Sequence, residues 1–247
     1  MPGRFKIFAS IFLVFIFFFF SGCVTIDNPA TGRRETLLID TASEVSLGSD
    51  LDEGVRQKLK LYSDQAMQAR LNSIGNRIAR VCDRQDLSYH FRIIDDDSLN
   101  AFALPGGFVY VHKAVMQEAS DDELAGVLGH EIGHVAARHS VKRLQADLGY
   151  QLLIGIALGA TGKQYVGDCL GVVFDTVNLG YSRKDEYLAD RLAVRYEKRA
   201  GFNPWGMVSF LEKLEKEGGG SKLVFLSSHP PVKERIEKVK EEIAASL

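Results

Sequence analysis

The chain has 247 residues, of which 46% are hydrophobic and 25% are charged, and its formal net charge is −2. This composition is typical of a globular protein with one substantial core. A nearly neutral chain without a long basic run has little electrostatic attraction for nucleic acid, so nucleic-acid-binding proteins are excluded as a class.

Residues 1–22 have the organisation of a bacterial signal peptide. Two basic residues precede an apolar run over 7–20, and two small residues stand directly before Cys23. The run is shorter than the roughly 20 residues that span a bilayer. Small residues before a cysteine resemble a lipobox, which predicts that Cys23 is lipidated after cleavage. An uncleaved anchor and an ordinary secretory signal are the alternatives, and in all three cases the domain works outside the cytoplasm.

The mature chain would retain two further cysteines. Cys82 and Cys169 could form a disulfide in an oxidising compartment, and neither lies in a Cys-x-x-Cys pattern. A metal or redox site built from thiols is therefore not expected.

Residues 23–42 are predicted to form a tether between the membrane and the domain. They are mostly polar and include Pro29 and Gly32. The domain is expected to extend over 43–247. Its first part, to about residue 82, carries apolar residues spaced three and four apart, which predicts amphipathic helices.

Two short segments are predicted to be strands. Tyr89–Ile94 and Phe108–His112 alternate in polarity and are rich in aromatic and β-branched residues. The stretch between them, 95–107, is rich in turn-forming residues.

A helix is predicted to begin at residue 121. Ser120 and Glu123 have the spacing of a capping box, and two acidic residues in the first turn suit the positive end of the helix dipole. This helix is expected to continue to about Arg143. It therefore contains the segment His-Glu-Ile-Gly-His at 130–134.

The C-terminal part is predicted to be helical with one unusual segment. Residues 149–180 combine apolar residues with several glycines, and we expect a short buried helical hairpin or a lid there, with a membrane-touching element as the alternative. The apolar run in it is too short and too interrupted to span a membrane. Helices are predicted over 184–199 and about 232–245.

The segment 130–134 carries the residues of a metallohydrolase. Residues four apart on a helix are about 400° apart round its axis, so His130 and His134 project from one face and can bind one ion. Glu131 lies about 100° away, where its carboxylate can reach a water on the metal. Zinc lowers the pKa of such a water to about 7, so that a carboxylate can take its proton. We therefore expect a zinc hydrolase with one zinc ion (Zn²⁺) per chain.

A catalytic zinc needs a third protein ligand. The metzincin pattern is excluded, because Ala137 and Ser140 stand where it requires glycine and histidine. On an unbroken helix His139 would lie about half a turn from His130 and face away from the metal. We expect His139 at the surface or behind the ligands.

A carboxylate on the later helix is the remaining candidate. Glu186 is the predicted third ligand, and Asp190 follows one turn later on the same face. Asp190 could hydrogen-bond a ligand histidine and fix its tautomer, or it could donate a proton to the leaving amine. Taken alone, this pair could also be ordinary solvated charges of a helix surface.

Together these segments resemble the HtpX/BepA-type family of zinc metallopeptidases, which are gluzincins related to the CAAX prenyl proteases. The resemblance covers about 45–247 and rests on motifs that occur in the order of the family: Asn100–Gly107, Leu128–His134, Tyr181–Asp190 and Ser228–Arg235. It implies an α+β, mainly helical, zincin-like metallopeptidase fold with a small β-sheet beside the helix that carries His-Glu-x-x-His.

The resemblance also implies roles for the site residues. His130, His134 and Glu186 correspond to the zinc ligands of the family, Glu131 to its general base and Asp190 to its proposed proton donor. The chain is similar to the compact periplasmic lipoprotein branch, since it lacks the many membrane helices of the prenyl proteases.

Two further groups receive candidate roles: His229 with Arg235 by hypothesis, from their place between a loop and the last helix, and a strand from the family resemblance. His229 could approach the zinc to stabilise the oxyanion or to occlude the open position, with Arg235 as an ion-pair partner. An extended peptide could pair with a strand edge and be held across the zinc, and the residues of that strand are Phe108, Val109, Tyr110 and Val111. A packed turn histidine and an ordinary core strand are the structural alternatives.

We therefore expect a zinc endopeptidase of the bacterial cell envelope that cleaves unfolded or misassembled proteins. A lipid on Cys23 would anchor it to a membrane on the periplasmic side. Val24, which follows the cysteine, is not the aspartate that would suggest retention at the inner membrane, so the outer membrane is favoured. The alternatives are an envelope chaperone or assembly factor in which peptide binding outweighs cleavage, and a zinc hydrolase that acts on a non-peptide bond.

Overall fold

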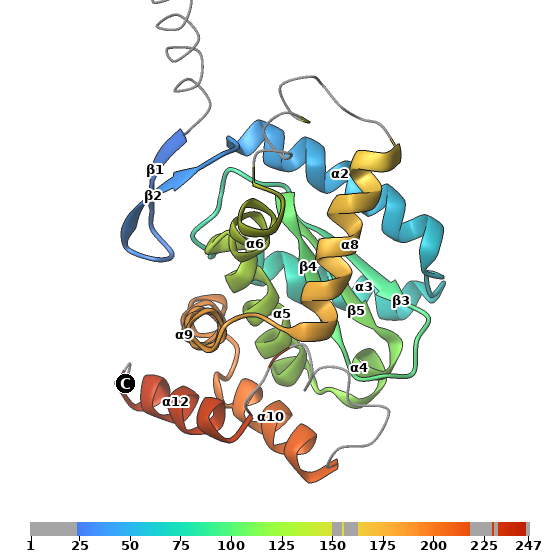
Figure 1. Cartoon of the computed structure of the whole chain (residues 1–247). Helices are drawn as coiled ribbons and strands as arrows, with labels where there is room; N and C mark the ends of the chain where they lie inside the picture. The colour runs from blue at the N-terminus through green and yellow to red at the C-terminus, as the bar shows by residue number, and fades with distance from the viewer. Residues whose placement is uncertain (1–23, 150–154, 156–162, 218–228, 230–231, 246–247) are drawn as a thin grey trace, which may run out of the picture.

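The computed structural model describes residues 24–149, 155, 163–217, 229 and 232–245. The predicted signal peptide and Cys23 lie outside these residues. The described elements (Figure 1) are, in chain order, β1 (Val24–Asn28), β2 (Arg33–Leu37), α2 (Thr41–Lys58), α3 (Gln65–Ala79), β3 (His90–Ile94), β4 (Ala101–Leu104), η1 (Pro105–Gly107), β5 (Phe108–His112), α4 (Lys113–Glu118), α5 (Asp121–Ala136), α6 (His139–Leu148), α8 (Lys163–Leu179), α9 (Arg183–Ala200), α10 (Trp205–Glu217) and α12 (Val232–Ala245). The fold is α+β and mainly helical, which confirms the expected class.

The larger sheet has three strands in the order β3-β5-β4. β5 pairs in parallel with β3 and antiparallel with β4, so it is the middle strand. The two predicted strands are confirmed as β3 and β5, but the turn-rich stretch between them also contains β4. All four β4 side chains are buried. The strand therefore lacks the alternation of polarity by which a half-exposed strand is detected in a sequence.

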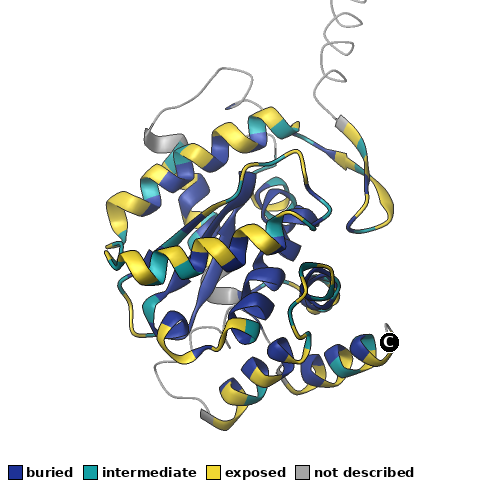
Figure 2. Cartoon of the chain, turned by 180° about the vertical axis from the view of Figure 1, so that it is seen from behind, coloured by how far each residue is buried: buried dark blue, intermediate teal, exposed yellow. Residues whose placement is uncertain are grey.

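The sheet separates two hydrophobic clusters. Val109 and Val111 of β5 belong to one cluster with residues of α3 and α5. Phe108 and Tyr110 of the same strand belong to the other, with residues of α2, α6 and α8. This division follows from the period of two along a strand. Figure 2 shows the strands buried between the surrounding helices.

The helix α5 begins as the sequence predicts and is almost wholly buried. Ser120 accepts from the N–H of Glu123, and the Glu123 carboxylate accepts from the N–H of Ser120, so the capping box is formed. The residues from Glu123 to Ala136 are all buried. Because α5 is packed on all sides, it cannot rotate, and the directions in which His130 and His134 project are fixed.

Two glycines allow α5 and α9 to approach closely. A Cβ atom at Gly129 would lie 3.1 Å from the Cα of Ala193. A Cβ atom at Gly133 would lie 3.0 Å from the backbone oxygen of Ala189. Any larger residue would push the helices apart. The two helices that carry the candidate metal ligands are therefore in direct backbone contact.

The helix predicted to run to about Arg143 is in fact broken. α5 ends at Ala136, Arg138 adopts the left-handed region at φ 56°, and α6 begins at His139. Arg138 donates from Nη1 to Glu44 at 2.5 Å and from Nη2 to the Thr41 hydroxyl at 2.9 Å. The unfavourable backbone conformation is thus held by partners on α2, which local sequence patterns do not reveal.

The segment predicted to be a tether is folded where it is described. β1 and β2 form an antiparallel hairpin, whose turn contains Gly32 at φ 65°. The hairpin is fixed to the domain, because Glu35 lies 2.6 Å from the ammonium of Lys142 and Leu37 is buried. The domain boundaries placed at residues 23 and 43 remain a prediction.

Part of the glycine-rich segment 149–180 lies outside the described residues, so the expected lid or hairpin stays a prediction. Its later part forms α8, which packs against α2 and α6 (Figure 1). Cys169 lies in the cluster with α2, whereas Cys82 lies in the cluster with α3. Among the helices that the structure describes, none combines the length and the apolar character needed to cross a membrane.

Glu197 of α9 is a buried acid with an expected effect on stability. It is fully buried, and neither carboxylate oxygen has a hydrogen-bond partner among the described residues. Burial, together with repulsion from Asp122 and Asp190, raises the pKa of Glu197 well above its usual value. Between the pKa that Glu197 has in the unfolded chain and its higher pKa in the folded protein, Glu197 is protonated in the folded state but ionised in the unfolded state. The free energy of unfolding therefore falls as the pH rises through this interval.

We expect Glu197→Gln to remove this pH dependence, because an amide does not titrate. The variant should be more stable than the wild type at pH 8 by at least about 1 kcal/mol, and this difference should shrink toward pH 5. Urea unfolding at several pH values measures it. Glu241→Gln, at an exposed position of α12, is the control and should change little. A difference that does not vary with pH would contradict the assignment.

Candidate metal centre

The helix α5 presents two histidines to one point. His130 and His134 are fully buried, and their Nε2 atoms lie 3.0 Å apart. Two ring nitrogens at this distance need a proton or a cation between them, because their lone pairs repel. The structure thus brings together the two histidines that the helical spacing predicts to share a face.

Glu186 reaches the same point from α9. Ser182 caps this helix by accepting from the N–H of Asp185, which sets where the helix begins. The carboxylate oxygens of Glu186 lie 3.5 Å from Nε2 of His130 and 3.5 Å from Nε2 of His134. These three residues and His229 offer ligand atoms that all lie within 4.8 Å of one another.

The separations in this cluster suit a zinc ion. Bonds of about 2.0–2.2 Å in tetrahedral directions place neighbouring ligand atoms about 3.3–3.6 Å apart. The three separations among His130, His134 and Glu186 are 3.0, 3.5 and 3.5 Å. Two imidazoles and one carboxylate are also a ligand set of catalytic zinc sites. The residues therefore fit the metal that the sequence predicts.

Glu131 lies beside the cluster with an unused oxygen. The side chain is buried, and its Oε1 atom has no hydrogen-bond partner among the described residues. Oε1 lies 3.6 Å from Nε2 of His229. A buried carboxylate oxygen without a partner is costly, and such groups are kept mainly where function needs them. This oxygen is available to accept a proton from a reactant.

Asp190 connects His130 to a buried positive charge. Its Oδ1 atom lies 2.8 Å from Nδ1 of His130. Arg235 of α12 donates to both oxygens of Asp190, at 2.7 and 2.8 Å, and its Nη1 atom lies 3.2 Å from Glu186. Arg235 is itself fully buried. The Asp190 carboxylate therefore lies behind His130, and Arg235 balances the charges of Asp190 and Glu186.

These charges attract a cation to the centre. Burial and Arg235 oppose protonation of His130, but its hydrogen bonds with Asp190 and Glu186 outweigh them and raise the pKa of His130 to about 9. Burial would raise the pKa of Glu186, but His229, Arg235 and the hydrogen bonds of the ligand histidines hold that pKa well below its usual value. A metal ion bound here would take the place of the His130 proton.

His229 completes the cluster from the C-terminal side. Its Nδ1 atom lies 3.0 Å from Oε1 of Glu186 and 3.2 Å from Nε2 of His130. Its backbone oxygen accepts from Nη1 of Arg235 at 2.8 Å. His229 was expected to approach the metal with Arg235 in support, and the structure brings both residues to the cluster. His229 is thus one of the four residues whose ligand atoms lie close enough together to hold one ion.

The strand expected to bind a peptide has no open edge. Phe108, Val109, Tyr110 and Val111 belong to β5, which is paired on both sides by β3 and β4. The expectation that a peptide pairs with this strand is therefore wrong, because its backbone groups are already used within the sheet. β4 is the edge strand that packs beside α5. On this edge, the Ser140 hydroxyl donates to the backbone oxygen of Ala103 at 3.2 Å.

No role was predicted for Tyr181, which lies beside the centre. The ring of Tyr181 stacks on His134, with centroids 4.2 Å apart, and its hydroxyl lies 2.8 Å from that of Ser140. Its position next to the cap of α9 is the signal that could have indicated it. His139 is buried, and its Nδ1 atom lies 2.8 Å from Nδ1 of His134, so of the two places expected for it the structure gives the one behind the ligand candidates. It does not face away from the centre, because the helix is broken before it.

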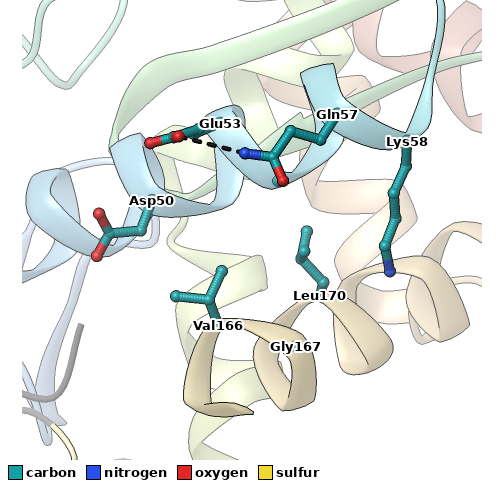
Figure 3. Close-up of a pocket in the computed structure, with 8 residues that line it drawn as sticks. Asp50, Glu53, Gln57, Lys58, Val166, Gly167 and Leu170 are labelled. Atoms are coloured by element: carbon teal, nitrogen blue, oxygen red, sulfur yellow. Dashed lines mark hydrogen bonds between the residues drawn. The ribbon is translucent and has the colours of Figure 1, made fainter. Parts of the chain in front are cut away.

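A cavity of about 350 Å³ lies elsewhere, between α2 and α8 (Figure 3). No residue of the metal centre takes part in it. Figure 3 shows acidic and amide side chains of α2 facing apolar side chains of α8, and the lining residues are Asp50, Glu53, Gly54, Gln57, Lys58, Val166, Gly167 and Leu170. The cavity and the histidine cluster are separate features of the fold.

Comparison with known proteins points to one family. The family model described as peptidase family M48 matches residues 65–243. The beta-barrel assembly-enhancing protease of Escherichia coli (strain K12) is 30% identical over 200 residues, which cover 77% of this chain but 41% of that protein. The chain thus spans less than half the length of this relative.

Two shorter relatives match over nearly their whole length. Metalloprotease YcaL of Escherichia coli (strain K12) is 28% identical, with 87% of this chain and 92% of that protein covered. Metalloprotease LoiP of the same organism is 26% identical, with 91% and 92% covered. The region of this chain that the family model matches contains His130, His134 and Glu186.

Proposed function

This chain belongs to peptidase family M48, and on that premise we propose that it is a zinc-dependent endopeptidase that cleaves unfolded or misassembled proteins of the bacterial cell envelope. The observation that carries the proposal is the convergence of His130, His134 and Glu186 on one buried point beside the unpartnered oxygen of Glu131. A purely structural role would leave no reason to keep that oxygen without a partner.

The residues divide the reaction among them. Zinc, when held by His130, His134 and Glu186, supplies Lewis acidity that brings the pKa of a water to about 7 and polarises the peptide carbonyl. Glu131 accepts the proton of the attacking water and returns it to the leaving amine. Asp190 keeps the Nδ1 proton of His130 in place, so that Nε2 of this histidine presents its lone pair.

Two roles were considered for Asp190, support of a ligand histidine and proton donation, and two for His229, closure of the open metal position and oxyanion stabilisation. The position of each residue favours the first of its two roles. Asp190 is tied to His130 and Arg235, so we assign it to holding the ligand rather than to donating a proton to the amine. His229 offers Nδ1 at a fourth ligand position, so we assign it to closing the open position of the metal rather than to the oxyanion.

The substrate class follows from the edge strand and the relatives. With β5 enclosed, an extended peptide can pair only with an edge strand of the sheet, and β4 is the edge beside α5. A folded protein does not offer such a strand, so unfolded chains are favoured. The relatives named beta-barrel assembly-enhancing proteases and the predicted lipid on Cys23 support a place in the envelope, on the periplasmic side of the outer membrane.

The same name supports the alternative of an assembly factor in which binding of the client outweighs cleavage. The experiment is to incubate the full chain with unfolded casein, with and without a chelator, and to measure its zinc content. We expect about one zinc per chain, cleavage that the chelator abolishes, and recovery when zinc is added back. Cleavage that survives removal of the metal would overturn the proposal. Zinc binding with capture but no cleavage would favour the assembly factor.

His229→Ala forms a further arm of this experiment. We expect the variant to keep its zinc and to cleave faster than the wild type, because a side chain that competes for the open position is removed. His90→Ala, at an exposed position of β3, is the control. Slower cleavage with zinc retained would instead support the oxyanion role. Unchanged zinc content and unchanged cleavage would exclude both roles.

A further inference from the structure

His139 contacts the outer nitrogen of a metal-ligand candidate. Its Nδ1 atom lies 2.8 Å from Nδ1 of His134, and both side chains are buried. The two rings meet edge to face, with centroids 4.9 Å apart. A hydrogen bond between two ring nitrogens needs an N–H on one and a lone pair on the other. The contact therefore fixes the tautomers of both residues together.

The inner side of His134 decides which residue donates. Its Nε2 atom faces His130 and Glu186 across the metal centre, so this nitrogen must keep its lone pair to bind an ion. The N–H of a neutral His134 is then at Nδ1 and donates a hydrogen bond to Nδ1 of His139. His139 accepts at Nδ1, so its own N–H is at Nε2, which lies 3.4 Å from Oδ1 of Asp185. The donors and acceptors thus follow one order, from His134 to His139 and from His139 toward Asp185.

The two ligand histidines are supported by different groups, and the charge of the centre explains why. The Asp190 carboxylate stands behind His130, but a neutral imidazole stands behind His134. Among the described residues, the buried centre already holds the carboxylates of Glu131, Glu186 and Asp190, with Arg235 as their buried cation. Another buried carboxylate would add an uncompensated charge, whereas an imidazole accepts the same hydrogen bond without one.

The break between α5 and α6 is what places His139. On a continuous helix this residue would lie on the opposite side from His130. The left-handed conformation of Arg138 folds the chain back instead, and Glu44 and Thr41 of α2 hold the Arg138 side chain. A non-glycine residue in this conformation costs about 1–2 kcal/mol. The hydrogen bonds to Glu44 and Thr41 hold Arg138 in this conformation, and the conformation places His139 behind His134.

We propose that His139 is a positioning residue that holds His134 in the tautomer and orientation needed for metal binding, and that the Arg138–Glu44 pair sets its place. This inference rests on the proposed zinc site. It assigns His139 no contact with substrate. Its effect is expected on the affinity for zinc before any effect on the chemical step.

The test measures zinc affinity of the full chain by competition with a chromophoric chelator. His139→Leu removes the acceptor, and we expect zinc to bind about 10- to 100-fold more weakly. His139→Asn keeps a polar atom near the position of Nδ1 and should lose less than about tenfold. Val141→Ala is the matched control, since Val141 is buried on the same helix and belongs to the apolar cluster. It should lower stability while leaving zinc affinity unchanged.

The outcomes separate this inference from the proposed function. If the wild type binds no zinc, the proposed function fails. If the wild type binds zinc tightly and His139→Leu binds it equally well, only the role of His139 fails. An equal loss in Val141→Ala would show that helix packing, not the hydrogen bond, is responsible. If the leucine variant does not fold, imidazole nitrogen NMR of the zinc-bound wild type decides. A proton on Nε2 of His134, rather than on Nδ1, would overturn the inference.

Discussion

Glu131→Gln is expected to abolish cleavage while leaving the metal in place. The amide matches the carboxylate in shape but cannot accept a proton, and general-base catalysis of this kind contributes about 10²- to 10⁴-fold to the rate. Zinc content should stay at about one per chain, because Glu131 is not among the ligand atoms that converge with Glu186. The measurement is the rate of cleavage of unfolded casein together with metal analysis of the same sample.

The unpartnered oxygen makes this substitution informative about folding as well. Oε1 of Glu131 is buried and has no hydrogen-bond partner among the residues that the structure describes, so replacing the carboxyl group by an amide should not destabilise the fold. A loss of activity can then not be ascribed to unfolding. Asp121→Asn makes the same chemical change at an exposed position of α5 and should keep full activity. Undiminished cleavage by Glu131→Gln would refute the assignment of the base.

Among the substitutions proposed for this protein, Arg235→Met is expected to lower the free energy of unfolding most. Arg235 is fully buried and is the cation that balances Asp190 and Glu186. Removing one partner of a buried ion pair leaves uncompensated charge and typically costs about 3–5 kcal/mol. Methionine keeps the apolar part of the side chain, so the cost reports the charge and its hydrogen bonds. Denaturant unfolding of the full chain measures it.

Zinc should modulate this loss, which ties the stability effect to the metal centre. A bound cation compensates Glu186 in part, so the destabilisation should be larger in chelated protein than in zinc-loaded protein. The control is Lys240→Met, on the same helix as Arg235. It breaks a half-exposed ion pair with Glu212 of α10 and should cost no more than about 1 kcal/mol. An effect of Arg235→Met as small as that of the control would contradict the role of Arg235.

The helical part of the site could be predicted because its information is local. The capping box at Ser120 and Glu123 fixes where α5 begins, and the spacing of His130 and His134 then fixes their common face. Glu186 followed from the chemistry of zinc, which needs a third ligand, and from the family resemblance. The structure brings these three residues to one point because α9 packs on α5 through Gly129 and Gly133.

Other features depended on residues far away in the chain. The helix break at Arg138 is held by Glu44, and no pattern near residue 138 indicates that partner. For that reason His139 was expected on the wrong side of the helix. β4 was missed because a strand buried on both faces has no alternation, and without β4 the strand β5 was taken for an edge.

By itself, the sequence determined the chemistry of this protein: a pair of histidines on one helical face, a carboxylate between them, and an acidic partner on a later helix. Periodicity and capping act over a few residues, so they can be read from the chain alone. The tertiary structure decided which groups surround that chemistry. Only packing brings His139 behind His134, seats Arg235 between Asp190 and Glu186, and encloses β5 within the sheet. These contacts join segments that are distant in sequence, and their energies depend on burial, which exists only once the chain has folded.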